Sequence, residues 1–180
     1  MSSHSISIVP RNSEIIQSKE KANEILEWLI SIDVVKKSTS DCILGSNNGY
    51  AISEGAKRIT NDIKYLPYNL ITNGLEITTK RQIFNTGQGG LEKCICPNCG
   101  ENVESDFWEF LDEWFENKSN DLKCSECGNG TEINKYQIEP QWGFSNIGFT
   151  FWNWSMFKED FINEFREKLG VDIFIIHSKI

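Results

Sequence analysis

Apolar and polar positions alternate or recur at helical spacing along most of the chain, and these two patterns predict its elements. Residues 5–9 alternate and predict a first strand, whereas residues 18–34 carry apolar side chains on one face of a helix. A hairpin is expected over 41–53, and extended segments are expected at 75–79 and 81–84. The first half of the chain therefore combines strands with one long helix.

An aromatic-rich stretch at residues 142–154 is the most distinctive part of the second half. It is typical of a hairpin or a bent central strand. Alternation places Phe149 and Phe151 on one face and Trp152 and Trp154 on the other. A sheet that is covered on both faces has this pattern, although such a stretch can also form an aromatic recognition surface.

Two further helices follow from the pattern. Residues 105–118 predict a helix that Asp106 caps, with aromatic side chains on one side and carboxylates on the other. Ser155 is expected to cap a helix over 155–169. The apolar residues 171–177 predict a buried closing strand.

Two matched cysteine motifs flank the acidic helix: Cys96-Pro97-Asn98-Cys99-Gly100 and Cys124-Ser125-Glu126-Cys127-Gly128. The two-residue spacing lets a tight turn direct both sulfur atoms at one ion, and the following glycine accepts a positive φ. Four thiolates are the ligand set of a closed, structural Zn²⁺ site, and iron in a four-sulfur site is the alternative. The predicted metal ligands are Cys96, Cys99, Cys124 and Cys127.

This pair of motifs resembles the zinc-ribbon modules, whose knuckles commonly read C-P-x-C-G and C-x-x-C-G. The resemblance covers residues 92–136, and the helix at about 105–118 is an insertion between the two knuckles. It implies bound metal and indicates no reaction. Cys94 lies close enough in sequence to compete for the ion, whereas Cys42 is expected to be a small buried apolar residue.

The order of these elements predicts an α+β fold, with a mixed or antiparallel sheet, packed helices and an embedded zinc ribbon. Residues 1–180 have the length of a single domain. Four of the six cysteines are explained by metal binding, which argues for a reducing compartment, and no apolar run is long enough to span a membrane. We therefore expect a cytoplasmic protein that has no membrane partner.

The charge of the chain bears on its partners. The formal net charge is −8, and carboxylates are dense between the two knuckles. Nucleic-acid-binding proteins usually carry the opposite sign, so a nucleic-acid partner is disfavoured. The acidic helix face is either a solvated surface or a binding surface for a basic partner.

The sequence favours a non-enzymatic, protein-binding function of the adaptor or immunity type, by compositional analogy with small acidic bacterial proteins. The residues considered for partner binding are Trp108, Trp114, Trp142, Trp152, Asn153 and Trp154.

Two alternatives stay open. Nucleic-acid binding by the ribbon requires scattered basic residues to converge on one face, namely Lys57, Arg58, Lys64, Lys80 and Arg81. An enzyme using carboxylate or thiol chemistry requires a deep polar pocket lined by Asp, Glu or Cys42. The chain has only two histidines, His4 and His177, to serve as a neutral-pH base.

Overall fold

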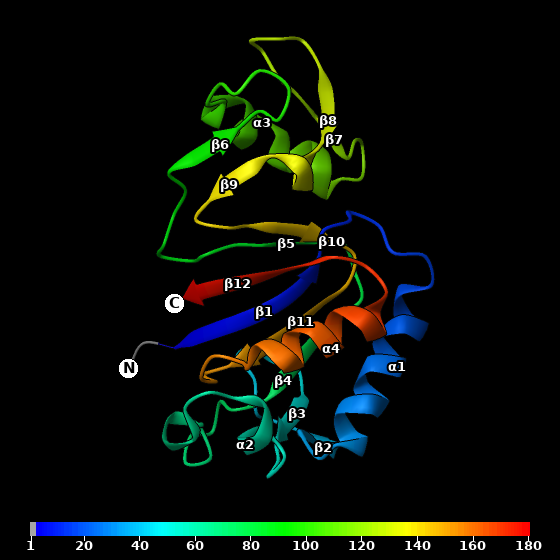
Figure 1. Cartoon of the computed structure of the whole chain (residues 1–180), viewed down its shortest axis with the longest axis vertical. Coiled ribbons are helices and arrows are strands. Elements are labelled where there is room, and N and C mark those ends of the chain that lie inside the picture. The colour runs from blue at the N-terminus through cyan, green and yellow to red at the C-terminus, as the bar shows by residue number, and fades with distance from the viewer. Residues whose placement is uncertain (1–2) are drawn as a thin grey trace.

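A six-stranded antiparallel sheet organises the structure (Figure 1). The computed structural model describes residues 3–180, so residues 1 and 2 of the predicted domain lie outside the described residues. The strand order is β12-β1-β11-β4-β3-β2, and the predicted α+β class is confirmed. The strands are β1 (His4–Pro10), β2 (Val35–Ser40), β3 (Gly49–Ile52), β4 (Leu75–Thr78), β11 (Gly148–Trp152) and β12 (Ile173–Lys179).

Helices α1 (Ser18–Ser31) and α4 (Glu159–Leu169) cover one face of this sheet (Figure 1). The rings of Trp28 and Phe161 stack at 5.6 Å between centroids and join the two helices. Phe165 of α4 meets Phe149 of β11 edge-on at 5.1 Å. The main apolar core therefore lies between the helices and the strands. A short helix α2 (Ala56–Ile59) and the 3₁₀ turn η1 (Ile63–Tyr65) follow β3, and Ala56 and Ile59 belong to this core.

A two-stranded ladder of β5 (Gln82–Phe84) and β10 (Gly143–Ser145) lies over the other face. Close approach depends on Gly148, because a Cβ built there would lie 2.1 Å from the Phe84 ring. The apolar contacts of this layer involve Val9, Phe84, Phe174 and Ile176.

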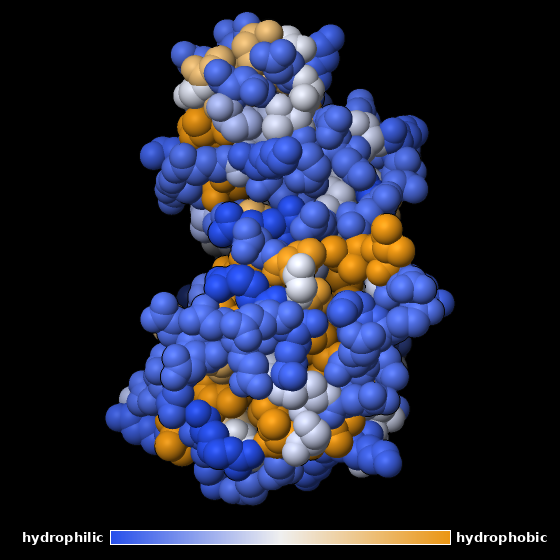
Figure 2. Space-filling view, turned by 45° about the vertical axis from the view of Figure 1, so that its right-hand side comes forward, coloured by the Kyte–Doolittle hydropathy of each residue, from blue (hydrophilic) through white to orange (hydrophobic). Residues whose placement is uncertain are grey.

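The cysteine-rich segment lies beyond β5 and β10 and has an apolar cluster of its own, separate from the main core (Figure 1). Its apolar cluster includes Phe107, Phe110 and Trp114 from the helix. On the face drawn in Figure 2, its surface is mostly hydrophilic, whereas hydrophobic side chains gather below it. Its elements are β6 (Lys93–Ile95), α3 (Glu104–Phe115), β7 (Asp121–Lys123), β8 (Gly130–Glu132), η2 (Ile133–Lys135) and β9 (Gln137–Glu139). We call this segment the cysteine module.

Two sequence predictions are wrong in detail, and one strand was not predicted. The hairpin expected over 41–53 does not form, and β3 pairs with β2 instead. The Cys42 carbonyl accepts hydrogen bonds from the backbone N–H groups of residues 73 and 74, so it is not bonded to a strand. β2 was not predicted because its exposed residues, 36–40, are all polar. Ser155 does not cap α4, which begins four residues later, since its hydroxyl donates to the Asp62 carbonyl.

The strand β11 ends at Trp152, and this changes the expected facing of the aromatic residues. Asn153 adopts a left-handed φ of 63° and breaks the alternation. The Trp154 ring consequently lies 5.0 Å from the Phe151 ring, on the helix-covered side. Trp152 lies on the opposite side, as predicted.

Candidate metal centre

The four predicted ligand cysteines converge at one end of the cysteine module. Their Sγ atoms all lie within 4.8 Å of one another. The Cys96–Cys127 and Cys99–Cys124 sulfur pairs are 3.9 Å and 3.7 Å apart. A tetrahedral ion with Zn–S bonds of about 2.3 Å places its sulfurs roughly 3.8 Å apart, so the donor set fits a four-thiolate metal ion. Both Zn²⁺ and an iron ion accept this donor set.

The two knuckles have the same backbone geometry. Gly100 N donates to the Cys96 carbonyl and Gly128 N to the Cys124 carbonyl, each at 2.9 Å. Both glycines have a positive φ, 79° and 74° respectively. The left-handed glycine closes each turn, and the turn directs both cysteines of its motif to the same point.

The thiols perturb one another electrostatically. Burial raises the pKa of Cys96, but hydrogen bonds from the backbone N–H groups of Asn98 and Cys99 outweigh it and lower the pKa overall. The pKa of Cys99 is raised, although the backbone N–H of Glu101 lowers it, because burial and the neighbouring thiols act in the other direction. Four thiolates at this spacing therefore need a cation to balance their charge.

Helix α3 is tied directly to the second knuckle. Asp106 was expected to cap the helix, but α3 begins two residues earlier, and the Asp106 carboxylate accepts a hydrogen bond of 2.8 Å from Ser125 N. In the first knuckle, Asn98 donates its side-chain N–H to Thr131 Oγ1 of β8 at 2.7 Å. The inserted helix and the β7–β8 hairpin thus hold the cysteine turns in place.

The two remaining cysteines stay outside the cluster. Cys94 is fully buried in β6, and burial raises its pKa to about 12, so it is an unreactive core thiol. Cys42 is also buried, as predicted. It packs so closely against Gly74 that a Cβ there would lie 2.2 Å from its sulfur.

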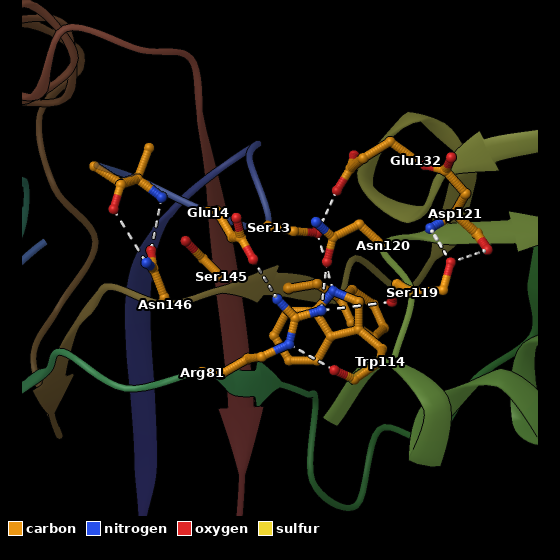
Figure 3. Close-up of polar contacts among 12 residues, drawn as sticks. Ser13, Glu14, Arg81, Trp114, Ser119, Asn120, Asp121, Glu132, Ser145 and Asn146 are labelled. Carbon is orange, nitrogen blue, oxygen red and sulfur yellow. Dashed lines mark hydrogen bonds and ion pairs between the residues drawn. The ribbon is translucent and has the colours of Figure 1, made fainter. Parts of the chain in front are cut away.

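A polar cluster joins the cysteine module to the sheet, and sequence reasoning missed it (Figure 3). We call it the joint; it consists of Ser13, Arg81, Trp114, Asn120, Glu132 and Asn134. The Arg81 guanidinium lies 3.9 Å from the centre of the Trp114 ring and donates to the Trp114 carbonyl near the end of α3. It also donates to the side chain of Asn120.

The rest of the joint is bonded through Ser13. Trp114 Nε1 donates to Ser13 Oγ at 2.9 Å, and this hydroxyl donates to Glu132. Glu132 accepts two further bonds from Asn134, at 2.9 Å each, and Asn134 bonds to the backbone of Phe144 in β10. Ser13, Arg81 and Trp114 are far apart in sequence and belong to no motif, so no local signal predicted their contact.

The structure separates Trp108 from the other residues considered for partner binding. Trp108 is 45% exposed on α3. The other five are 0–8% exposed, and the indole N–H groups among them bond within the chain. Their burial contradicts a role as surface anchors and supports the core alternative. They are Trp114, Trp142, Trp152, Asn153 and Trp154.

Comparison of the chain with protein-family models, with curated proteins and with solved structures finds no match. The zinc ribbon thus stays a resemblance carried by the knuckles. Within residues 3–180, no helix is both long and apolar enough to cross a bilayer.

Proposed function

We propose that this protein binds a basic segment of a partner protein through the outer face of α3, and that Zn²⁺ in the four-cysteine site stabilises the platform. The observation that supports this function best is a pair of exposed aromatic rings on a face that otherwise carries carboxylates. We call this face the α3 surface; it consists of Trp108, Glu109, Asp112, Glu113, Phe115 and Glu116.

The composition of the α3 surface suits a cationic ligand. Trp108 is 45% exposed and Phe115 is 60% exposed, although the helix buries its other large rings. A Lys or Arg side chain placed on an indole face gains a cation–π interaction, and neighbouring carboxylates provide charge-assisted hydrogen bonds. Asp112 lies one helical turn from each ring.

Repulsion on this surface also favours a cationic partner. Glu109 and Glu113 are spaced i, i+4 within α3, and such a like-charge pair destabilises an isolated helix by about 0.2–0.5 kcal/mol. Glu116, at the C-cap of α3, pairs with the neighbouring Lys118. α3 itself contains no Lys or Arg. A bound basic segment would relieve this repulsion, so binding and helix stability are coupled.

The metal site gives the α3 surface its rigidity. The Trp108 ring meets the buried Trp142 ring edge-on at 5.7 Å between centroids, and Asp106 anchors the helix to the knuckle at Ser125. A preordered surface loses less conformational entropy when it binds. Ligand cysteines must stay reduced, which suits a cytosolic location.

The structure gives nucleic-acid binding less support. The side chain of Arg81 is 13% exposed and its donors are engaged in the joint. Lys57 pairs with Glu54, and Arg58 donates to the Ile32 carbonyl. These contacts leave less positive charge available to phosphate groups.

The proposed function is tested by quantitative pull-down from nuclease-treated lysate of the source cells, with the wild-type chain and two variants. Trp108→Ala combined with Asp112→Lys should remove a partner that the wild-type chain retains in near-equal amount. Ile71→Ala is the control, since Ile71 is 83% exposed and lies outside the cysteine module. Retention of the partner by the α3 variant would refute the proposed surface.

A second measurement identifies the metal and the chemistry of the partner. Elemental analysis of the purified chain should give one zinc ion for each four-cysteine site. The captured protein should carry a Lys- or Arg-rich segment, and a synthetic peptide of that segment should bind less tightly as salt rises. A salt-independent affinity would contradict the electrostatic argument.

A further inference from the structure

The sheet face beneath β5 carries buried hydroxyl groups where a core would place apolar side chains. Ser5, Ser7 and Thr150 are only 3%, 5% and 7% exposed. The strand register pairs Ser7 with Thr150 and Thr150 with Glu76, across β1, β11 and β4. Directly opposed residues of antiparallel strands lie on the same face. Ser7, Thr150 and Glu76 therefore form one continuous polar row.

A cavity of about 150 Å³ lies along this row. β5 contributes Gln82 and Phe84 to its lining, and β11 contributes Trp152. At about 30 Å³ per water molecule, the volume corresponds to roughly five waters. The cavity is thus large enough for a small organic molecule with a short stem, and its walls combine polar groups with two aromatic rings.

The charge of the cavity comes from Glu76. Its carboxylate accepts a 3.0 Å hydrogen bond from Trp152 Nε1, and within the described residues it forms no ion pair. In that part of the chain, no Lys, Arg or His lines the cavity. His4 and Lys179 lie nearby and pair with each other across β1 and β12. Each is next in sequence to a residue that lines the cavity, and neighbouring residues of a strand point to opposite faces, so both belong to the other face of the sheet.

The hydrogen-bonding groups around Glu76 mostly have acceptor capacity to spare. The Ser7 and Thr150 hydroxyls bond to each other at 2.8 Å, which leaves lone pairs on both oxygens. A carboxylate beside hydroxyl oxygens suits a ligand with several N–H donors and a positive charge. The rings of Phe84 and Trp152 suit an apolar stem next to that charge.

We propose that this cavity binds a small primary ammonium ion, with its nitrogen on Glu76 and the row of hydroxyls, and with its alkyl stem against Phe84 and Trp152. The three N–H donors of an ammonium group match one carboxylate and two hydroxyl oxygens. This site is separate from the α3 surface and does not depend on a protein partner.

The probe is n-propylammonium chloride, titrated into the metal-loaded full chain and followed by the NMR signal of the Trp152 indole N–H. This proton should shift saturably, with a Kd of about 1 mM for so small a ligand. Neutral n-propanol, which matches the probe in size, and sodium chloride at equal ionic strength should give no saturable shift. Equal binding of n-propanol, or no saturable shift with n-propylammonium, would overturn the proposal.

Glu76→Gln keeps the shape of the side chain and removes its charge. We expect it to weaken n-propylammonium binding at least tenfold, whereas Glu164→Gln, an exposed change on α4, should leave the Kd unchanged. Urea unfolding checks that each variant is folded. If Glu76→Gln does not fold, Thr150→Val tests the hydroxyl row instead and should weaken binding several-fold. Wild-type affinity in the folded variant would refute the proposed site.

Discussion

Arg81→Met is the substitution that most directly tests how the cysteine module is held on the sheet. Met keeps an apolar stem of similar length and removes the guanidinium. The variant loses the stacking on Trp114 and the hydrogen bonds to the Trp114 carbonyl and to Asn120. The carbonyl lies in the last turn of α3, where backbone acceptors have no partner within the helix.

The size of the effect follows from these contacts. Two hydrogen bonds from a charged donor contribute about 1.5–3 kcal/mol each, and the cation–π contact adds about 1 kcal/mol. Burial opposes them, because desolvation lowers the pKa of Arg81 and thus disfavours its charged form. We therefore expect Arg81→Met to lower the free energy of unfolding by about 2–4 kcal/mol.

The assay is urea unfolding of the metal-loaded chain, combined with amide hydrogen exchange. Arg58→Met is the matched control, because the exposed Arg58 also donates to a backbone carbonyl, that of Ile32. It should cost less than about 0.5 kcal/mol. In Arg81→Met, amides of α3 should exchange faster than those of β1, since the module loses its attachment. Equal costs for the two Arg variants would refute the role of the joint.

Three other outcomes follow from the structure. Cys124→Ser should abolish stoichiometric metal binding by elemental analysis and lower the unfolding midpoint, because metal binding of about 10 kcal/mol or more is coupled to folding in such modules; unchanged metal content would contradict the site. Gly148→Ala brings a Cβ to 2.1 Å from the Phe84 ring and should cost about 1–3 kcal/mol in urea unfolding. The same change at the open Gly130 should be nearly neutral, and equal costs would argue against close packing. Partial desolvation of its ring and the nearby His4 lower the pKa of His177, although the residue is exposed at the surface of β12. The unfolded chain therefore binds this proton more readily, and stability should fall as the pH drops through about 6.5; a pH profile that His177→Gln leaves unaltered would contradict this linkage.

Local patterns predicted much of the fold. Helices α1 and α3, the strands β1, β4 and β12, and the α+β class follow from local pattern, because the apolar residues within each element recur at the spacing of a helix or a strand. β2 escaped detection because it is an exposed polar edge strand. The metal ligands were the clearest prediction, since each cysteine pair lies within one tight turn and needs no distant residue to define its geometry.

The sequence by itself determined the four cysteines of the candidate metal site, the acidic helix between them and the alternation of the main strands, because these depend on residues a few positions apart. The tertiary structure alone decided which aromatic residues stay exposed: it buries Trp114 in the joint and leaves Trp108 on the surface, although both lie on α3. It also decided that Ser7, Thr150 and Glu76 meet in one row. Contacts between residues 70 or more positions apart depend on strand register and layer packing, which no local pattern specifies.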